Sequence, residues 1–204
     1  MNMSYLGLKK KELEQTDAPL PQTLAPRVKN SINYTYEEAI LTKWKTIKDI
    51  NAWIAQHFNY DLDRALELAD HSETREISNI YTPTQTFDAK KGICVDLARF
   101  AVETIQAVDP SINVKYLMIE FEPIRIGNRV LKRHWMVVYK ENNQLYTMAD
   151  TKYPGFIDGP YSDISEFVME YQKIRKRKIK SYSMLDTYKK TLKSPKRMKR
   201  MKQL

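Results

Sequence analysis

Apolar residues recur at helical spacing in two long stretches of the chain. The first opens with the capping-box pattern Thr35 and Glu38 and continues with Ala39, Ile40, Trp44, Ile47, Ile50, Ile54 and Phe58. The second follows Gly92, continues with Cys94, Leu97, Ala98, Ala101, Val102, Ile105 and Val108, and meets a stop signal at Asp109-Pro110. This spacing predicts one helix over about 36–58 and another that begins after Gly92 and ends near Asp109.

Beyond the second helix the pattern changes to the β-branched and aromatic residues typical of strands. Three such runs, 114–122, 130–140 and 144–149, are separated by the turn candidates Gly127-Asn128 and Asn142-Asn143. They predict an antiparallel meander. Asp163 and Glu166 can then cap a final amphipathic helix over about 163–179. The expected fold class is α+β, with the second helix packed on the sheet.

The composition is that of a folded protein with polar appendages, since the 204 residues are 42% hydrophobic and 29% charged. Residues 1–30 are polar and rich in proline, so we expect an N-terminal arm, one domain over 31–172 and a basic C-terminal extension over 173–204. A single cysteine allows no internal disulfide, and no stretch resembles a signal peptide or a membrane span. We therefore expect a cytoplasmic protein without a membrane partner.

The net charge of +9 is concentrated at the C-terminal end. Between Lys173 and Lys202 there are 14 Lys or Arg and a single acid, Asp186, whereas the remaining residues carry 20 bases and 24 acids. Such a segment is either a solvated, solubilising extension or an electrostatic attachment to RNA, DNA or an acidic protein surface. In the second case Tyr182 and Tyr188 are available for stacking on bases.

Cys94 opens the second predicted helix and permits two interpretations. A thiol in the first turn lies near the positive end of the helix dipole, which favours the nucleophilic thiolate. Free cysteines are also among the most buried residues, and Cys94 falls on the apolar stripe of its helix, as a packing residue would. No phosphate-binding loop, dinucleotide fingerprint or metal-ligand spacing accompanies it, so we expect neither cofactor nor metal.

A cysteine nucleophile needs a general base and a group that orients that base. The chain has three histidines, and His57 and His71 stand in segments that favour a surface position. His134 stands inside a predicted strand, where an ionisable residue needs a partner. Asp150 ends the next predicted strand, so the two side chains can meet across the sheet. Cys94, His134 and Asp150 therefore form a candidate catalytic triad.

These segments resemble the transglutaminase-like superfamily of papain-like Cys-His-Asp enzymes. GICVDLA around Cys94 is similar to its G-x-C-x-D-x-A nucleophile motif, INAWIAQHFNYDLDRA to the preceding helix and YD segment, and RHWMVV and ADTKY to its histidine and aspartate strands. The resemblance covers about 47–153 and implies a papain-like core without cofactor. It also implies that Cys94 attacks an amide or peptide carbonyl, that His134 takes and then donates the proton, and that Asp150 holds the imidazole.

One feature departs from the family pattern, and the oxyanion donors and the reaction type are not specified by it. Family members often have tryptophan two residues after the histidine, whereas Trp135 follows directly and on a strand must face the opposite side. The backbone N–H of Cys94 and the side chain of Gln85 are the candidate oxyanion donors. The small body favours hydrolysis of a protein or peptide over transamidation. Because the superfamily includes inactive members, the alternative is a silent binding or structural module attached to nucleic acid or an acidic partner through its basic tail.

Overall fold

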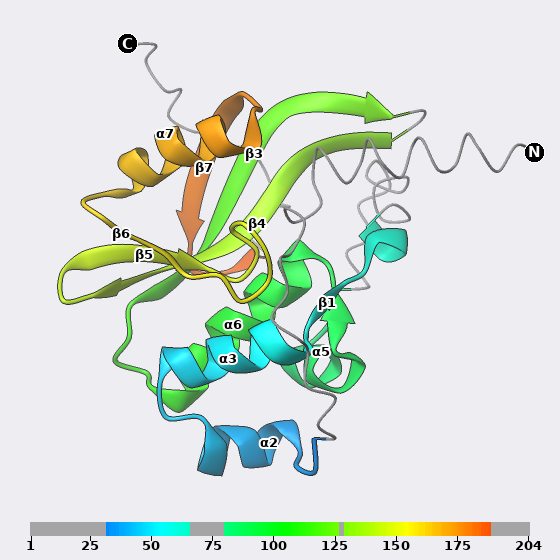
Figure 1. Cartoon of the computed structure of the whole chain (residues 1–204), viewed down its shortest axis with the longest axis vertical. Coiled ribbons are helices and arrows are strands. Elements are labelled where there is room, and N and C mark those ends of the chain that lie inside the picture. The colour runs from blue at the N-terminus through cyan, green and yellow to red at the C-terminus, as the bar shows by residue number, and fades with distance from the viewer. Residues whose placement is uncertain (1–31, 66–79, 127–128, 189–204) are drawn as a thin grey trace, which may run out of the picture.

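The computed structural model in Figure 1 describes residues 32–65, 80–126 and 129–188. The predicted N-terminal arm over 1–30, His71, the turn candidate Gly127-Asn128 and the end of the basic extension over 189–204 lie outside the described residues. The described part combines helices with an antiparallel sheet, which confirms the predicted α+β fold class.

Five strands form the main sheet. They are β3 (Val114–Ile126), β4 (Arg129–Glu141), β5 (Gln144–Met148), β6 (Asp158–Tyr161) and β7 (Ile179–Leu185), in the spatial order β6-β5-β4-β3-β7. All neighbouring strands are antiparallel. The predicted turn between β4 and β5 is confirmed, because Asn142 and Asn143 have φ of 50° and 63°, the left-handed values of a two-residue type I′ hairpin.

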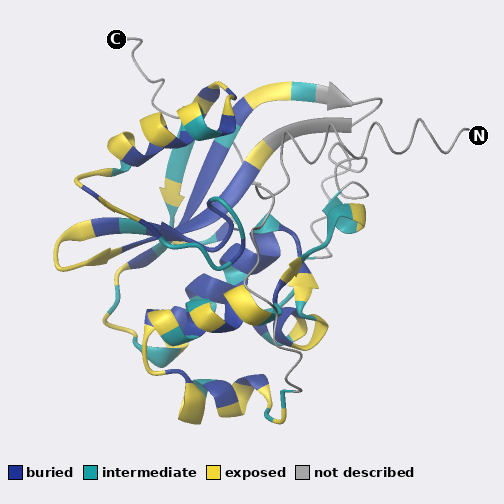
Figure 2. Ribbon diagram, viewed as in Figure 1, coloured by how far each residue is buried: buried dark blue, intermediate teal, exposed yellow. Residues whose placement is uncertain are grey.

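Helices cover both faces of this sheet. α6 (Cys94–Val108) packs on β3 and β4 from one side, and α3 (Ile47–His57) and α5 (Pro83–Ala89) pack on α6. α2 (Tyr36–Glu38) and the π-helix η1 (Ala39–Lys43) complete this helical layer below the sheet in Figure 1. α7 (Ile164–Arg175) lies on the other side of the sheet, at the upper left. Buried residues, dark blue in Figure 2, concentrate in the sheet and in α6.

The side chains of β4 alternate between these two layers, as a strand requires. On the α6 side they join a lower core that includes Leu97, Ala101, Ile105, Met118, Trp135 and Val137. On the α7 side they join an upper core that includes Leu117, Ile119, Met136, Val138, Phe167 and Tyr171. Both faces of β4 are therefore buried, each against a different helix.

The first predicted helix is interrupted. Trp44 has an extended backbone, with φ of −92° and ψ of 124°, and a new helix starts at Ile47 with Thr46 as its cap. Trp44 is buried at 3% exposure, with its ring 5.9 Å from that of Phe100 and 6.1 Å from that of Trp53. Asp49 and Thr46 form a second capping box, a start signal inside the apolar stripe that the periodicity alone concealed.

The C-terminal end differs from the prediction in two ways. The final helix ends at Arg175 instead of about 179, because Lys176 adopts the left-handed conformation with φ of 50°. The following residues form β7, which pairs with β3, and Tyr188 is buried in the lower core. Residues 173–188, expected in a basic extension, thus complete the folded domain.

Candidate active site

Cys94 is the first residue of α6, and its side chain is partly buried against the lower core. The strand pair before it sets this position: β1 (Asn59–Tyr60) runs parallel to β2 (Lys91–Gly92), and Ile93 then caps the helix. The thiol therefore stands at the helix N-terminus, where unpaired N–H groups and the dipole favour negative charge. Its backbone N–H stays the candidate for one oxyanion donor.

Asp96 locks the start of this helix. Its carboxylate is fully buried and accepts hydrogen bonds from the N–H groups of Ile93 and Tyr81, both at 2.8 Å. Arg64 forms an ion pair with the same carboxylate, and its second amino group lies 3.3 Å from Oδ1. At Gly92 a Cβ atom would come within 3.0 Å of Oδ2, so glycine gives Asp96 its room. The glycine, the cysteine and the aspartate of the sequence pattern thus form one structural unit.

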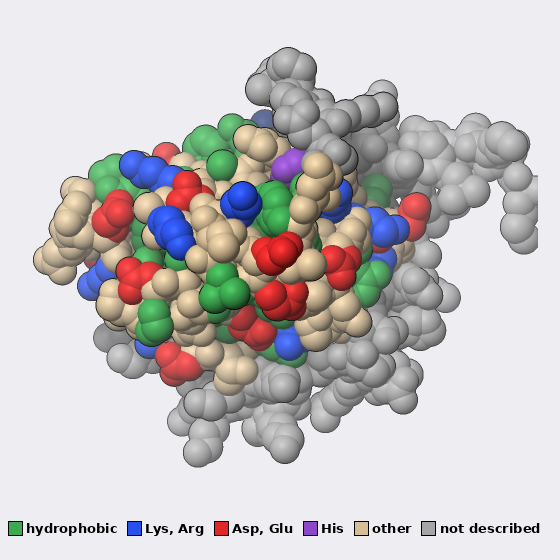
Figure 3. All heavy atoms as spheres, turned by 90° about the horizontal axis from the view of Figure 1, so that it is seen from below, with side chains coloured by type: hydrophobic (Ala, Val, Ile, Leu, Met, Phe, Trp, Pro, Cys, Tyr) green, Lys and Arg blue, Asp and Glu red, His purple; other side chains and the backbone are tan. Residues whose placement is uncertain are grey.

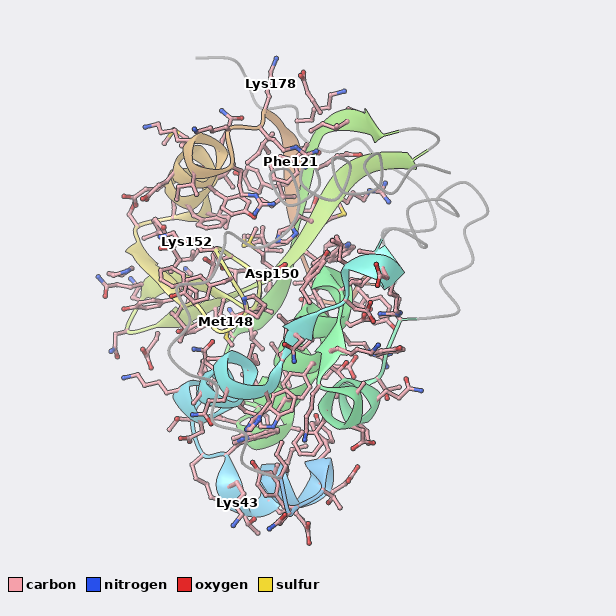
Figure 4. All side chains as sticks on the ribbon, turned by 45° about the vertical axis from the view of Figure 1, so that its right-hand side comes forward. Lys43, Phe121, Met148, Asp150, Lys152 and Lys178 are labelled. Atoms are coloured by element: carbon pink, nitrogen blue, oxygen red, sulfur yellow. The ribbon has the colours of Figure 1, made fainter. Side chains whose placement is uncertain are left out.

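His134 and Asp150 are brought together on the other side of the sheet. His134 Nε2 lies 2.7 Å from the backbone carbonyl oxygen of Asp150 and 3.8 Å from its carboxylate Oδ2. A carbonyl only accepts, so Nε2 carries the hydrogen and the contact fixes the tautomer. Asp150 follows β5 after Ala149, whose φ of 82° breaks the alternation of the strand. Figure 4 shows Asp150 at this exit, close beyond Met148.

The surroundings keep His134 neutral. Its side chain is 3% exposed, and its ring stacks on Tyr171 of α7 with centroids 6.3 Å apart. Burial foremost, and the positive charges of Arg175 and Arg177, lower the pKa of His134 to about 3, although the hydrogen bond to Asp150 raises it. An imidazole with this pKa is a poor proton acceptor at neutral pH.

The sheet separates this histidine from the cysteine. His134 is paired with Ile119 of the upper core, whereas the neighbouring pair Trp135 and Met118 belongs to the lower core, where Cys94 packs. In the described part of the chain, the polar and ring contacts of His134 go to Asp150 and Tyr171. The structure therefore brings two members of the predicted triad together and places the third in the other layer. The predicted opposite orientation of Trp135 is confirmed.

Arg133 is the residue of this strand segment that shares a face with Trp135. It pairs with Glu120 across β3, with Nε and Oε1 3.9 Å apart, and its side chain is 40% exposed. Ser181 of β7 donates a hydrogen bond to the same glutamate at 3.2 Å. Where a triad needs an imidazole on the α6 side, this chain has an arginine in a surface ion pair.

Three further predicted residues have structural roles. Gln85 caps α5: its amide oxygen accepts from Thr82 N–H at 2.9 Å, and its own N–H donates to the threonine hydroxyl. Tyr188 is buried, with its ring 5.9 Å from that of Tyr116, so it is not available for stacking on bases. Tyr182 packs beside the upper core and contacts Ser165 through its hydroxyl at 3.2 Å.

Sequence reasoning missed the partners that Asp96 and His134 acquire from distant segments. Arg64 and Tyr81 come from the segments on either side of residues 66–79, and Arg175 and Arg177 come from the end of α7 and the turn after it. Asp96 stands three residues after Ile93, the spacing by which a carboxylate caps a helix start, so its hydrogen bond to Ile93 could have been predicted from the sequence. The arginines carried no comparable local signal.

A family described as transglutaminase-like domain matches residues 30–188, which is more than half of the chain and covers every described element. The chain belongs to the transglutaminase-like family. Domains of this family are commonly enzymes of the cysteine-protease type, and some members are inactive. A search among curated proteins gave no match.

In residues 32–65, 80–126 and 129–188, no three His, Cys, Asp or Glu side chains are grouped so that they could hold a metal ion. Over the same residues, no helix has both the length and the apolar character needed to cross a membrane.

Proposed function

We propose that this transglutaminase-like domain is a binding or structural module in which His134 does not act as the general base for Cys94. The observation that carries the proposal is that the two side chains lie on opposite faces of the sheet. A general base must reach its proton directly or through one water, at about 3 Å per hydrogen bond, and an intervening sheet excludes both. The low pKa of His134, about 3, points the same way.

The second candidate is the thiol enzyme that the resemblance implies. It is favoured by the position of Cys94 at the first residue of the 15-residue helix α6 and by the contact between His134 and Asp150. In that enzyme Cys94 attacks an amide or peptide carbonyl, His134 takes and returns the proton, and water completes a hydrolysis. It requires β4 to turn its other face to α6, which a shift of one residue along the strand produces.

The alkylation rate of Cys94 by iodoacetamide, followed from pH 5 to 10, separates the two candidates. The binding module gives one inflection near the free-thiol value of about 8.5, or no labelling of the native protein, and His134→Gln leaves the profile unchanged. The enzyme gives a reactive thiolate below pH 7 that His134→Gln abolishes. His57→Gln is the matched control, since His57 lies at the end of α3.

A basic surface is the proposed means of attachment to nucleic acid or to an acidic partner. Four exposed lysines surround the end of α7 and the start of β7, namely Lys173, Lys176, Lys178 and Lys180, and Lys178 marks this end of the molecule at the top of Figure 4. The chain adds eight Lys or Arg and no acid after Tyr188. The face seen from below mixes acidic and basic side chains instead (Figure 3).

Deleting residues 189–204 tests this attachment without removing β7 or the buried Tyr188. The full chain is expected to bind a fluorescent single-stranded oligonucleotide, with affinity falling roughly 20- to 100-fold between 50 and 200 mM salt if about three to five phosphates are contacted. The truncated chain is expected to bind much more weakly. Equal binding by both chains excludes the attachment, and preference for a poly-glutamate peptide identifies an acidic protein partner instead.

A further inference from the structure

The ion pair between Arg64 and Asp96 joins the first turn of α6 to a separate segment of the chain. Asp96 lies two residues after Cys94, and its carboxylate is held at the N–H of Ile93, directly before the cysteine. A carboxylate in this position places negative charge in the same first helical turn as the thiol, and nearby negative charge disfavours the thiolate. Arg64 supplies the compensating charge, with 11% of its side chain exposed and 0% of that of Asp96.

We propose that Arg64 is a positioning residue for Cys94: by pairing with Asp96 it fixes the first turn of α6 and neutralises the carboxylate in the turn that carries the thiol. Several neighbouring groups hold this ion pair in place. Tyr81 N–H donates to Asp96, and the guanidinium carbon of Arg64 lies 3.9 Å from the centre of the Tyr81 ring. Asp61 anchors the segment that carries the arginine, since its Oδ1 accepts the N–H of Arg64 at 3.1 Å.

This inference is independent of the proposed function, because it concerns the charge around Cys94 whether or not the site turns over a substrate. It also assigns control of the thiol to groups on its own side of the sheet. Asp96 belongs to the helix that carries Cys94, and Arg64 and Tyr81 contact this aspartate, whereas His134 faces α7. The test of His134 and the test of Arg64 can therefore fail separately.

The apparent pKa of Cys94 alkylation distinguishes an electrostatic role from a merely structural one. Arg64→Gln leaves the carboxylate uncompensated, so we expect the apparent pKa of the thiol to rise and the rate at pH 7 to fall roughly threefold to tenfold. Asp96→Asn leaves the guanidinium uncompensated, and we expect a rate increase of similar size. The double variant removes both charges and is expected to lie within about threefold of the starting protein.

Arg99 provides the matched control on the same helix. It pairs with Glu103 at 2.9 Å and donates to the carbonyl groups of Ile80 and Tyr81, so Arg99→Gln also loosens the 80–81 segment. The variant removes a charge five residues along α6 from Cys94 and leaves Glu103 unpaired more than two helical turns away, so the alkylation profile of Cys94 is expected to change much less than in Arg64→Gln. Arg64→Lys, which keeps the charge, is expected to lower the melting temperature but to keep the pH profile.

Opposite shifts in Arg64→Gln and Asp96→Asn support the proposal. Shifts in the same direction, or unchanged profiles in folded variants, overturn it, since a purely structural lock loosens in the same way whichever partner is lost. If Arg64→Gln does not fold, Arg64→Lys and Asp96→Asn decide the question: the first must keep the apparent pKa of Cys94 and the second must lower it. Circular dichroism of each variant establishes that the folded protein is measured.

Discussion

His134 donates its Nε2 hydrogen to the backbone carbonyl of Asp150 across 2.7 Å, while the carboxylate oxygen of the same aspartate is 3.8 Å away. The two residues therefore stand in the order and proximity that a catalytic pair needs, but the main chain makes the contact. Any residue at position 150 supplies a carbonyl. The tautomer of His134 is consequently set by the course of the backbone after β5 and needs no carboxylate.

We expect Asp150→Asn to fold and to keep the Nε2–H tautomer of His134, because the carbonyl that accepts this hydrogen is unchanged. Cys94 alkylation is expected to stay within about twofold of the starting protein at every pH. Imidazole ¹⁵N shifts and iodoacetamide kinetics measure the two quantities. Asp158→Asn is the control, since Asp158 is also buried and pairs with Lys152 at 3.5 Å. A decrease in the alkylation rate of order 10³ or more, seen in Asp150→Asn and not in the control, supports a catalytic triad instead.

His134 is also expected to make stability depend on pH. Burial and the nearby arginines lower its pKa to about 3 in the folded protein, from 6.5 for the unperturbed group. Between these values the unfolded chain binds one more proton, so the free energy of unfolding decreases as pH falls from about 6.5 toward 3, by up to about 1.4 kcal/mol per pH unit. Above pH 7 this contribution is constant.

Urea unfolding of the starting protein and of His134→Gln at pH 7, 6, 5 and 4 measures this dependence. The glutamine variant lacks the titrating group, so the difference in free energy of unfolding between the two proteins is expected to shift in its favour as pH falls. His57→Gln controls for a histidine whose pKa is also lowered, by partial burial and Lys90. Parallel stability curves for the starting protein and His134→Gln contradict the burial of a neutral imidazole.

Local patterns predicted the elements around the site well, and their relative orientation poorly. The β4–β5 hairpin is specified by Asn142-Asn143 and its flanking strands, so the proximity of His134 and Asp150 followed from sequence. The face of β4 that packs against α6 did not follow from the sequence, because Trp135 and Val137 on one side and Met136 and Val138 on the other are all buried. A strand that is apolar on both faces has no alternation to show which side a helix covers.

The remaining features depend on contacts between segments distant in the chain. β7 has one lysine and two serines between its apolar residues and is recognisable as a strand only through its pairing with β3. The lock on α6 needs Arg64, 32 positions before Asp96 in the sequence. Neither relationship has a period or a local signal, so neither could be predicted from one sequence.

The loop after Asp150 is expected to be intolerant of side chains at Gly155. This glycine has φ of 86°, and a Cβ there would come within 2.5 Å of the Ala55 backbone in α3, while Asn51 Nδ2 donates to its carbonyl at 2.8 Å. Gly155→Ala is therefore expected to lower the free energy of unfolding by about 2 to 4 kcal/mol, through a strained backbone and an overpacked contact. Urea denaturation measures the loss.

Ala55→Gly is the companion variant for this contact. It removes the Ala55 Cβ but leaves the Ala55 backbone atoms in place, so Gly155→Ala combined with Ala55→Gly is expected to recover only part of the lost stability. Full recovery shows that the side chain alone limits the position. Unchanged stability in Gly155→Ala alone shows that the loop does not dock on α3 in solution.

A substitution at position 133 tests whether a histidine placed one residue earlier in β4 can act as the proton acceptor for Cys94. Arg133 lies two residues before Trp135 and shares its face, on the side of the sheet where Cys94 packs. Family members often have their histidine in that relation to the tryptophan. Arg133→His therefore places an imidazole in the layer that contains the thiol. We expect Cys94 alkylation at pH 6 to 7 to increase at least about threefold, with a new inflection near the ordinary histidine pKa of about 6.5.

Two variants make this result interpretable. Arg133→Gln removes the guanidinium from its ion pair with Glu120 without adding an imidazole, so it isolates the loss of charge and is expected to leave alkylation unchanged or slower. Arg133→His combined with His134→Gln is expected to keep the new inflection, because the native histidine faces α7. If the inflection disappears when His134 is replaced, His134 and not position 133 communicates with Cys94, and the assignment of the two faces of β4 is wrong. If Arg133→His matches Arg133→Gln at every pH, position 133 lies out of reach of the thiol.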